Sequence, residues 1–172
     1  MKLKIVFVLI VVAVIIFFDG CEQEGQTGLV FSGKLISHTG CKSSKSTMIN
    51  SDTPDTLSCA EYTFNETDNQ LIIKHINAGF NCCPESLYCD IELKNDSIFI
   101  HEHEIDGLCN CDCLFDLDIE ITGVKAKKYQ VKFVEPYTGN QKAIEFEMDL
   151  TSNHGGSVCV TRKQYPWGVP GW

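Results

Sequence analysis

Residues 113–122 read CLFDLDIEIT, and this stretch decides the fold. Apolar and acidic side chains alternate along it, with Phe115, Leu117, Ile119 and Ile121 set against Asp116, Asp118 and Glu120. Because successive side chains of a β-strand point to opposite faces, the pattern predicts a strand with one buried and one solvated face. Strands of this kind are typical of antiparallel sheets.

Similar segments recur along the chain, and no window keeps a helical period. We expect strands over residues 30–36, 61–65, 71–78, 88–93, 97–105, 113–122, 129–133, 144–150 and 158–162, with turn residues between them. Their number and spacing predict an all-β protein, an antiparallel β-sandwich. Residues 29–172 are expected to form it as a single domain.

One local pattern resembles a feature of immunoglobulin-like and fibronectin-type sandwiches. In residues 119–133, IEITGVKAKKYQVKF, a strand ends, a corner containing Gly123 follows, and Tyr129 opens the next strand. This resembles the tyrosine corner of those sandwiches, which implies that the hydroxyl of Tyr129 bonds back to the backbone of the corner. The alternative is an ordinary half-buried strand tyrosine.

The N-terminus reads as an export signal. Lys2 and Lys4 precede an unbroken apolar run over residues 5–18. That run is shorter than the about 20 residues that span a bilayer, and it suits the apolar region of a signal peptide covering residues 1–20. The polar residues 22–28, EQEGQTG, read as a flexible tether.

Cys21 directly follows this run and Gly20, an arrangement that resembles the lipobox of bacterial lipoproteins. The resemblance implies that Cys21 carries a lipid and anchors the protein to the cell membrane or the outer membrane. Asp19 departs from the pattern, which favours a small residue there. The alternatives are simple cleavage after Gly20 and an uncleaved anchor. Residues 75–84, HINAGFNCCP, together with 111–117, CDCLFDL, also resemble uncharacterised cysteine-rich bacterial envelope lipoproteins, a group that implies no known activity.

The charge restricts the partners. The 172 residues carry a net charge of −9, from 23 acidic and 14 basic side chains. Binding to nucleic acid or to anionic headgroups needs clustered basic residues, so neither is expected. The membrane is expected as a partner through the lipid alone, and the sequence names no protein or small-molecule ligand.

The cysteines carry the most distinctive chemistry. Export places them in an oxidising compartment, so nine are disulfide candidates: Cys41, Cys59, Cys82, Cys83, Cys89, Cys109, Cys111, Cys113 and Cys159. The expected partners of the cluster at 109, 111 and 113 are the cysteines at 82, 83 and 89. An odd number leaves one thiol over, unless Cys21 is not lipidated and pairs as well.

A metal site is the alternative interpretation of the same residues. Three cysteines at alternate positions, with Cys82 or Cys83 added, could present soft thiolates to zinc or copper, and the His101-Glu102-His103 motif could add imidazoles. The candidate ligands are Cys82, Cys83, Cys109, Cys111, Cys113, His101 and His103. The two histidines otherwise read as half-exposed polar positions.

The sequence therefore predicts an exported, lipid-anchored and disulfide-stabilised β-sandwich without a cofactor. The expected role is non-catalytic, either binding or structural, because the sequence contains no recognisable nucleophile or phosphate-binding motif. The alternatives are a zinc- or copper-binding lipoprotein and a thiol–disulfide exchange protein.

Overall fold

Nine strands make up the fold in the computed structural model, which describes residues 29–42, 53–105 and 109–163. The strands are β1 (Ser32–His38), β2 (Leu57–Asn65), β3 (Gln70–Asn81), β4 (Ser86–Lys94), β5 (Ser97–Ile105), β6 (Asp112–Thr122), β7 (Lys128–Val134), β8 (Glu145–Asp149) and β9 (Gly155–Thr161). Each of the nine predicted segments overlaps one of them. The described part of the chain holds no helix long and apolar enough to cross a membrane. The predicted signal peptide and tether, and the predicted lipid-attachment residue Cys21, lie outside the described residues.

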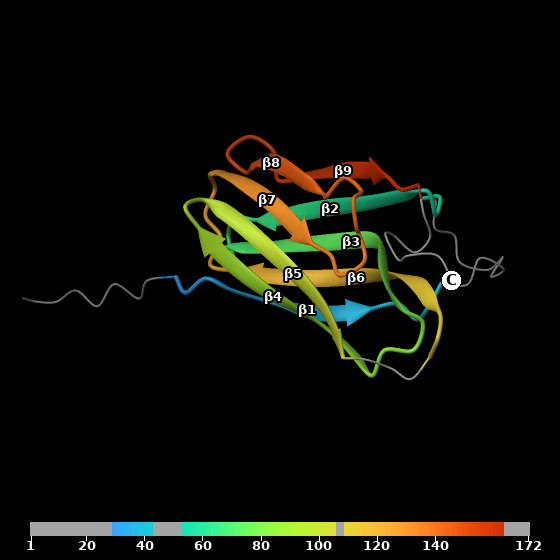
Figure 1. The fold of residues 1–172 in the computed structure, drawn as a ribbon. Coiled ribbons are helices and arrows are strands. Elements are labelled where there is room, and N and C mark those ends of the chain that lie inside the picture. Colours follow the sequence, from blue (N-terminus) through green and yellow to red (C-terminus); the bar gives the residue numbers. More distant parts are fainter. Residues whose placement is uncertain (1–28, 43–52, 106–108, 164–172) are drawn as a thin grey trace, which may run out of the picture.

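The strands form two sheets that pack face to face, so the predicted β-sandwich is confirmed (Figure 1). The first sheet has the order β1-β6-β3-β2-β9, and the second has the order β4-β5-β7-β8. One strand pair differs from the antiparallel expectation: β5 and β7 run parallel. They can do so because the chain leaves the second sheet after β5, forms β6 in the first sheet, and then returns.

The core lies between the sheets and follows the alternation seen in the sequence. On β6, Leu117, Ile119 and Ile121 are completely buried, and across the interior they face residues such as Ile100 and Val131. Each sheet thus contributes every second side chain to one shared interior, as the pattern predicts.

The acidic face predicted for β6 is only partly solvated. Asp116 is buried, and not exposed like a residue of an open sheet face. The chain after β1 crosses over it: Thr39 N donates to Asp116 O at 2.9 Å, and the Lys42 ammonium pairs with the Asp116 carboxylate. The sequence showed alternation but not which loop would cover the outer face.

A β-bulge interrupts β3. The pairing with β6 shifts register between His75 and Ala78, and Asn77 has a φ of 63°. The Asn77 amide group donates to the carbonyls of Pro54 (3.0 Å) and Leu57 (2.7 Å) and so fixes the segment before β2. Because the bulge adds a residue, both His75 before it and Phe80 after it point into the core.

The tyrosine corner is present. The hydroxyl of Tyr129 accepts a hydrogen bond from Lys125 N at 3.0 Å, while the ring is buried in the core. The bond holds the turn between β6 and β7, which carries the chain from one sheet to the other.

The substitution Tyr129→Phe should lower the free energy of unfolding by about 1 kcal/mol, the net value of one hydrogen bond. Urea denaturation with the disulfides intact measures it. Tyr62→Phe is the matched control, because no hydrogen bond of its hydroxyl is found within the described residues. An equal effect of both substitutions would contradict the role of the corner.

Candidate functional site

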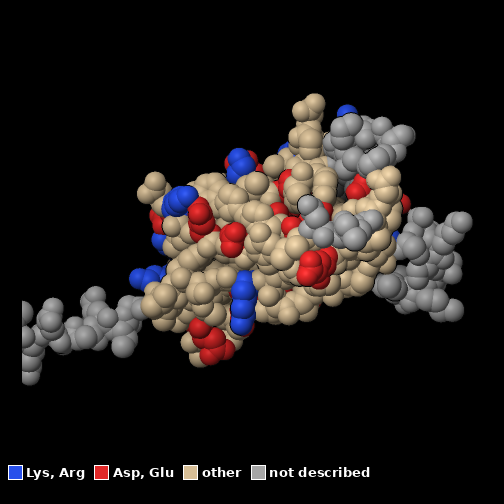
Figure 2. Space-filling view, turned by 60° about the horizontal axis from the view of Figure 1, so that its bottom comes forward, with Lys and Arg blue, Asp and Glu red and all other residues tan. Residues whose placement is uncertain are grey.

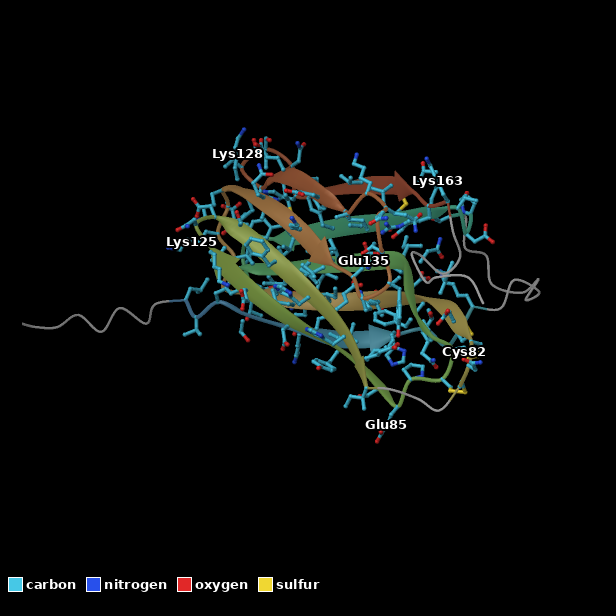
Figure 3. The ribbon with its side chains drawn as sticks, viewed as in Figure 1. Cys82, Glu85, Lys125, Lys128, Glu135 and Lys163 are labelled. Atoms are coloured by element: carbon cyan, nitrogen blue, oxygen red, sulfur yellow. A yellow bond between two sulfur atoms is a disulfide. The ribbon has the colours of Figure 1, made fainter. Side chains whose placement is uncertain are left out.

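Four disulfides connect eight of the described cysteines. They join Cys41 to Cys113, Cys59 to Cys159, Cys82 to Cys111, and Cys83 to Cys109. The last two lie side by side at the end of the sandwich where β3 leads into β4; Figure 3 labels Cys82 there. We call these four residues, Cys82, Cys83, Cys109 and Cys111, the double disulfide.

Two of the three predicted bridges between the clusters therefore form, and the third does not. An isolated β-bridge joins Lys42 and Leu114. Cys41 and Cys113 directly precede these two residues along the chain, so the bridge brings the two cysteines together and they form a disulfide. Cys59 and Cys159 lie directly opposite on β2 and β9.

Cys89, expected in a disulfide, is free and buried. It lies on β4 in the second sheet and faces the core. Its expected partners lie in β6 of the first sheet or just before it, and all of them pair with other cysteines: Cys109, Cys111 and Cys113. Burial, with smaller contributions from Glu102 and Asp90, strongly raises the pKa of the Cys89 thiol. It therefore stays protonated and has the properties of a small apolar core residue, not of a nucleophile.

The predicted thiolate metal site is only partly assembled. The sulfur atoms of Cys82, Cys109 and Cys111 lie within 4.8 Å of one another, but all three belong to disulfides, which leave no thiolate to bind a metal. Cys113 is committed to Cys41. His101 and His103 point outward from the middle of β5 and are not part of that group.

A cluster of charged side chains fills one part of the core between the sheets. Ser58 Oγ lies 2.8 Å from His75 Nε2, and His75 Nδ1 lies 2.6 Å from Glu102 Oε1. These residues come from β2, β3 and β5, so the contacts pass from the first sheet to the second. The side chains of His75 and Glu102 are completely buried.

A second ion pair adjoins the first. Arg162, just after β9, donates to both carboxylate oxygens of Glu135 at 2.7 and 2.6 Å, and also to Ser58 Oγ at 3.4 Å. Glu135 Oε1 lies 3.7 Å from His75 Nε2. We call these five residues, Ser58, His75, Glu102, Glu135 and Arg162, the buried polar cluster; Glu135 is labelled in Figure 3.

The order serine, histidine, carboxylate is that of a charge-relay triad, but the surroundings are wrong for catalysis. Ser58 is 0% exposed, it lies within strand β2, and Arg162 already donates to its oxygen. A nucleophile must reach a substrate carbonyl next to oxyanion donors. The cluster therefore acts as an internal connection between the sheets.

The cluster also contains three potential metal ligands, and the guanidinium of Arg162 already pairs with one of them. His75, Glu102 and Glu135 offer ligand atoms within 4.8 Å of one another. The guanidinium of Arg162 already supplies the positive charge that Glu135 requires. Arg162 donates two short hydrogen bonds to the Glu135 carboxylate. A metal ion bound to the same carboxylate would therefore lie close to the guanidinium, and the two positive charges would repel each other.

The buried polar cluster is not among the sites predicted from the sequence, although the alternation of side chains contains a signal for it. His75 has the parity of Leu71 and Ile73, and Glu102 has the parity of Ile98 and Ile100. Both are inward positions, so a charged residue there needed an internal partner.

Comparisons with known proteins give no relative: no protein-family model, no curated protein and no solved structure matches this chain.

Mild reduction should open the double disulfide first. Cys109 and Cys111 are exposed and their partners are partly exposed, so no cysteine of the double disulfide is buried. Each of the other two disulfides joins an exposed cysteine, Cys41 or Cys159, to a buried one, Cys113 or Cys59. Access of the attacking thiolate governs exchange. Graded reduction, alkylation and peptide mass mapping should therefore label the double disulfide before the other cysteines. Simultaneous or reversed labelling would contradict this order.

The stability should fall as the pH rises above about 6.5, the pKa of histidine in an unfolded chain. Burial lowers the pKa of His75, but the charges of Glu102 and Glu135 outweigh that effect and raise it overall. For Glu102, burial raises the pKa, and the attraction of His75 offsets only part of that rise. The folded state thus keeps a proton that the unfolded chain releases, and the stabilisation disappears as the pH rises through the raised pKa.

Urea denaturation between about pH 6 and 9 measures this dependence. Glu102→Gln removes the main charge that raises the pKa of His75, so it should flatten the curve, while the surface variant His154→Gln should keep it. A wild-type stability that is level or rises across this range would show that the interpretation of the cluster is wrong.

Proposed function

We propose that this chain is an exported β-sandwich protein of the bacterial cell envelope, held at the membrane by a lipid on Cys21, with a non-catalytic binding or structural role. The observation that carries the proposal is the set of four disulfides in one small sandwich. Such a set persists in oxidising compartments and is rare in the reducing cytosol.

The disulfides also fit a protein that must stay folded outside the cell. Two of them close loops of 72 and 100 residues along the sequence, and each removes freedom from the unfolded chain. A disulfide of that kind contributes about 2–4 kcal/mol. The apolar run before Cys21 supplies the export signal, and the lipid supplies the attachment.

The arrangement of the reactive groups supports a non-catalytic role. Ser58 and Cys89 are enclosed, and the cysteines of the double disulfide are oxidised. On the face drawn in Figure 2, acidic and basic side chains are interspersed. A nucleic-acid partner would require clustered basic residues, so it is not part of the proposal.

Intact-mass measurement of the protein from its native host, unreduced and after thiol alkylation, tests the proposal. We expect a diacyl or triacyl adduct on Cys21 and at most one alkylated thiol. The variant Cys21→Ser should leave the membrane fraction, whereas the matched variant Gln26→Ser should remain in it. An unmodified Cys21 would refute the lipid anchor, and three or more alkylatable thiols would refute the disulfide-stabilised module.

A further inference from the structure

The outer face of the second sheet carries a row of stacked rings. Phe99, His101 and His103 lie at alternate positions of β5, and Tyr88 of β4 stacks on His103 with ring centroids 4.9 Å apart. The imidazoles of His101 and His103 have centroids 6.4 Å apart and planes only 11° from parallel. The sheet therefore holds two imidazoles on one surface, with Phe99 next to His101 on β5 and Tyr88 opposite His103 on β4.

A carboxylate lies beside the two imidazoles. Asp90 of β4 lies directly opposite His101, and its Oδ2 is 3.3 Å from Nε2 of His103. With metal–nitrogen and metal–oxygen distances of about 2.0–2.2 Å, two neighbouring ligand atoms of one ion lie about 2.9–3.5 Å apart. This pair has the spacing of two ligands of a single ion. The ligand atoms of His101, His103 and Asp90 do not all lie within 4.8 Å of one another, so the ring of His101 must turn toward the pair for one ion to contact all three.

The local charges leave this position open to a cation. The other acidic side chains described on the outer face of this sheet pair with lysines, in the contacts Glu92–Lys94, Glu145–Lys132, Glu147–Lys128 and Asp149–Lys128. The ion pair described for Asp90 is with an imidazole instead.

We propose that His101, His103 and Asp90 bind one divalent late transition-metal ion, Zn²⁺ or Cu²⁺, on the outer face of β4 and β5. Two imidazole nitrogens and one carboxylate oxygen suit these ions, whereas Ca²⁺ and Mg²⁺ prefer oxygen ligands alone. The side chains of His103 and Asp90 are 39% and 70% exposed, so both are free to turn toward the ion.

The site uses no cysteine, so it is compatible with the oxidised protein. It also does not depend on export or on the lipid. Because three side chains from an open sheet surface cannot surround an ion, the remaining coordination positions are left to water or to a ligand from another molecule.

Calorimetric titration of the oxidised protein, purified without a histidine tag, with Zn²⁺ tests the proposal. We expect one ion per chain in the wild type and a loss of affinity of about tenfold or more in His101→Gln and in His103→Gln, with a smaller loss in Asp90→Asn. His38→Gln and His154→Gln remove exposed imidazoles elsewhere and should bind Zn²⁺ as the wild type does. Equal urea midpoints confirm that each variant is folded.

Electron paramagnetic resonance of the Cu²⁺ form provides a second readout. It should show two imidazole nitrogens on the ion in the wild type and one in each single histidine variant. Failure to saturate at one ion per chain would overturn the proposal. So would unchanged affinity in the variant that carries both His101→Gln and His103→Gln, because the ion would then be bound elsewhere.

Discussion

The hydrogen bond between His75 and Glu102 is the constraint on which the arrangement of the two sheets depends. Hydrophobic burial is non-directional, but a buried carboxylate that does not meet its partner costs several kcal/mol. His75 projects from β3 and Glu102 from β5, so the bond fixes where the first sheet lies against the second. Arg162 and Glu135 add a second fixed contact beside it.

Several other features of the fold hold the residues around this contact in position. The bulge at Asn77 shifts the alternation of β3 by one residue, so that Phe80 points into the core as His75 does. The side-chain amide of Asn77 donates to Leu57 O and holds the backbone directly before Ser58. The disulfide between Cys59 and Cys159 joins β2 to β9, directly before Arg162 enters the core. The interior is therefore specified by directional bonds as well as by packing.

Alternation at period two was enough to predict the strands, the sandwich and the tyrosine corner, because these depend on local chemistry. It did not predict the parallel pairing of β5 with β7, which depends on the path of the chain between sheets. Nor did it predict the pairing of Cys113 with Cys41, which depends on the path of the loop after β1. The free thiol of Cys89 depends on which sheet contains β4.

The buried polar cluster could have been predicted from the sequence, because the parity of His75 and Glu102 places both side chains inside. Of the candidate metal ligands, His101 and His103 share one surface, but Asp90 beside them is evident only once β4 and β5 are paired.

A double-mutant cycle on His75 and Glu102 tests the central claim most directly. The free energy of unfolding would be measured for the wild type, for His75→Leu, for Glu102→Leu and for the double variant, with all disulfides intact. Each single variant leaves one polar group buried without its partner and should cost about 3–5 kcal/mol, whereas the double variant should cost much less than the sum. Additive costs, within about 0.5 kcal/mol, would show that the two residues do not act together and that this bond does not fix the position of the sheets.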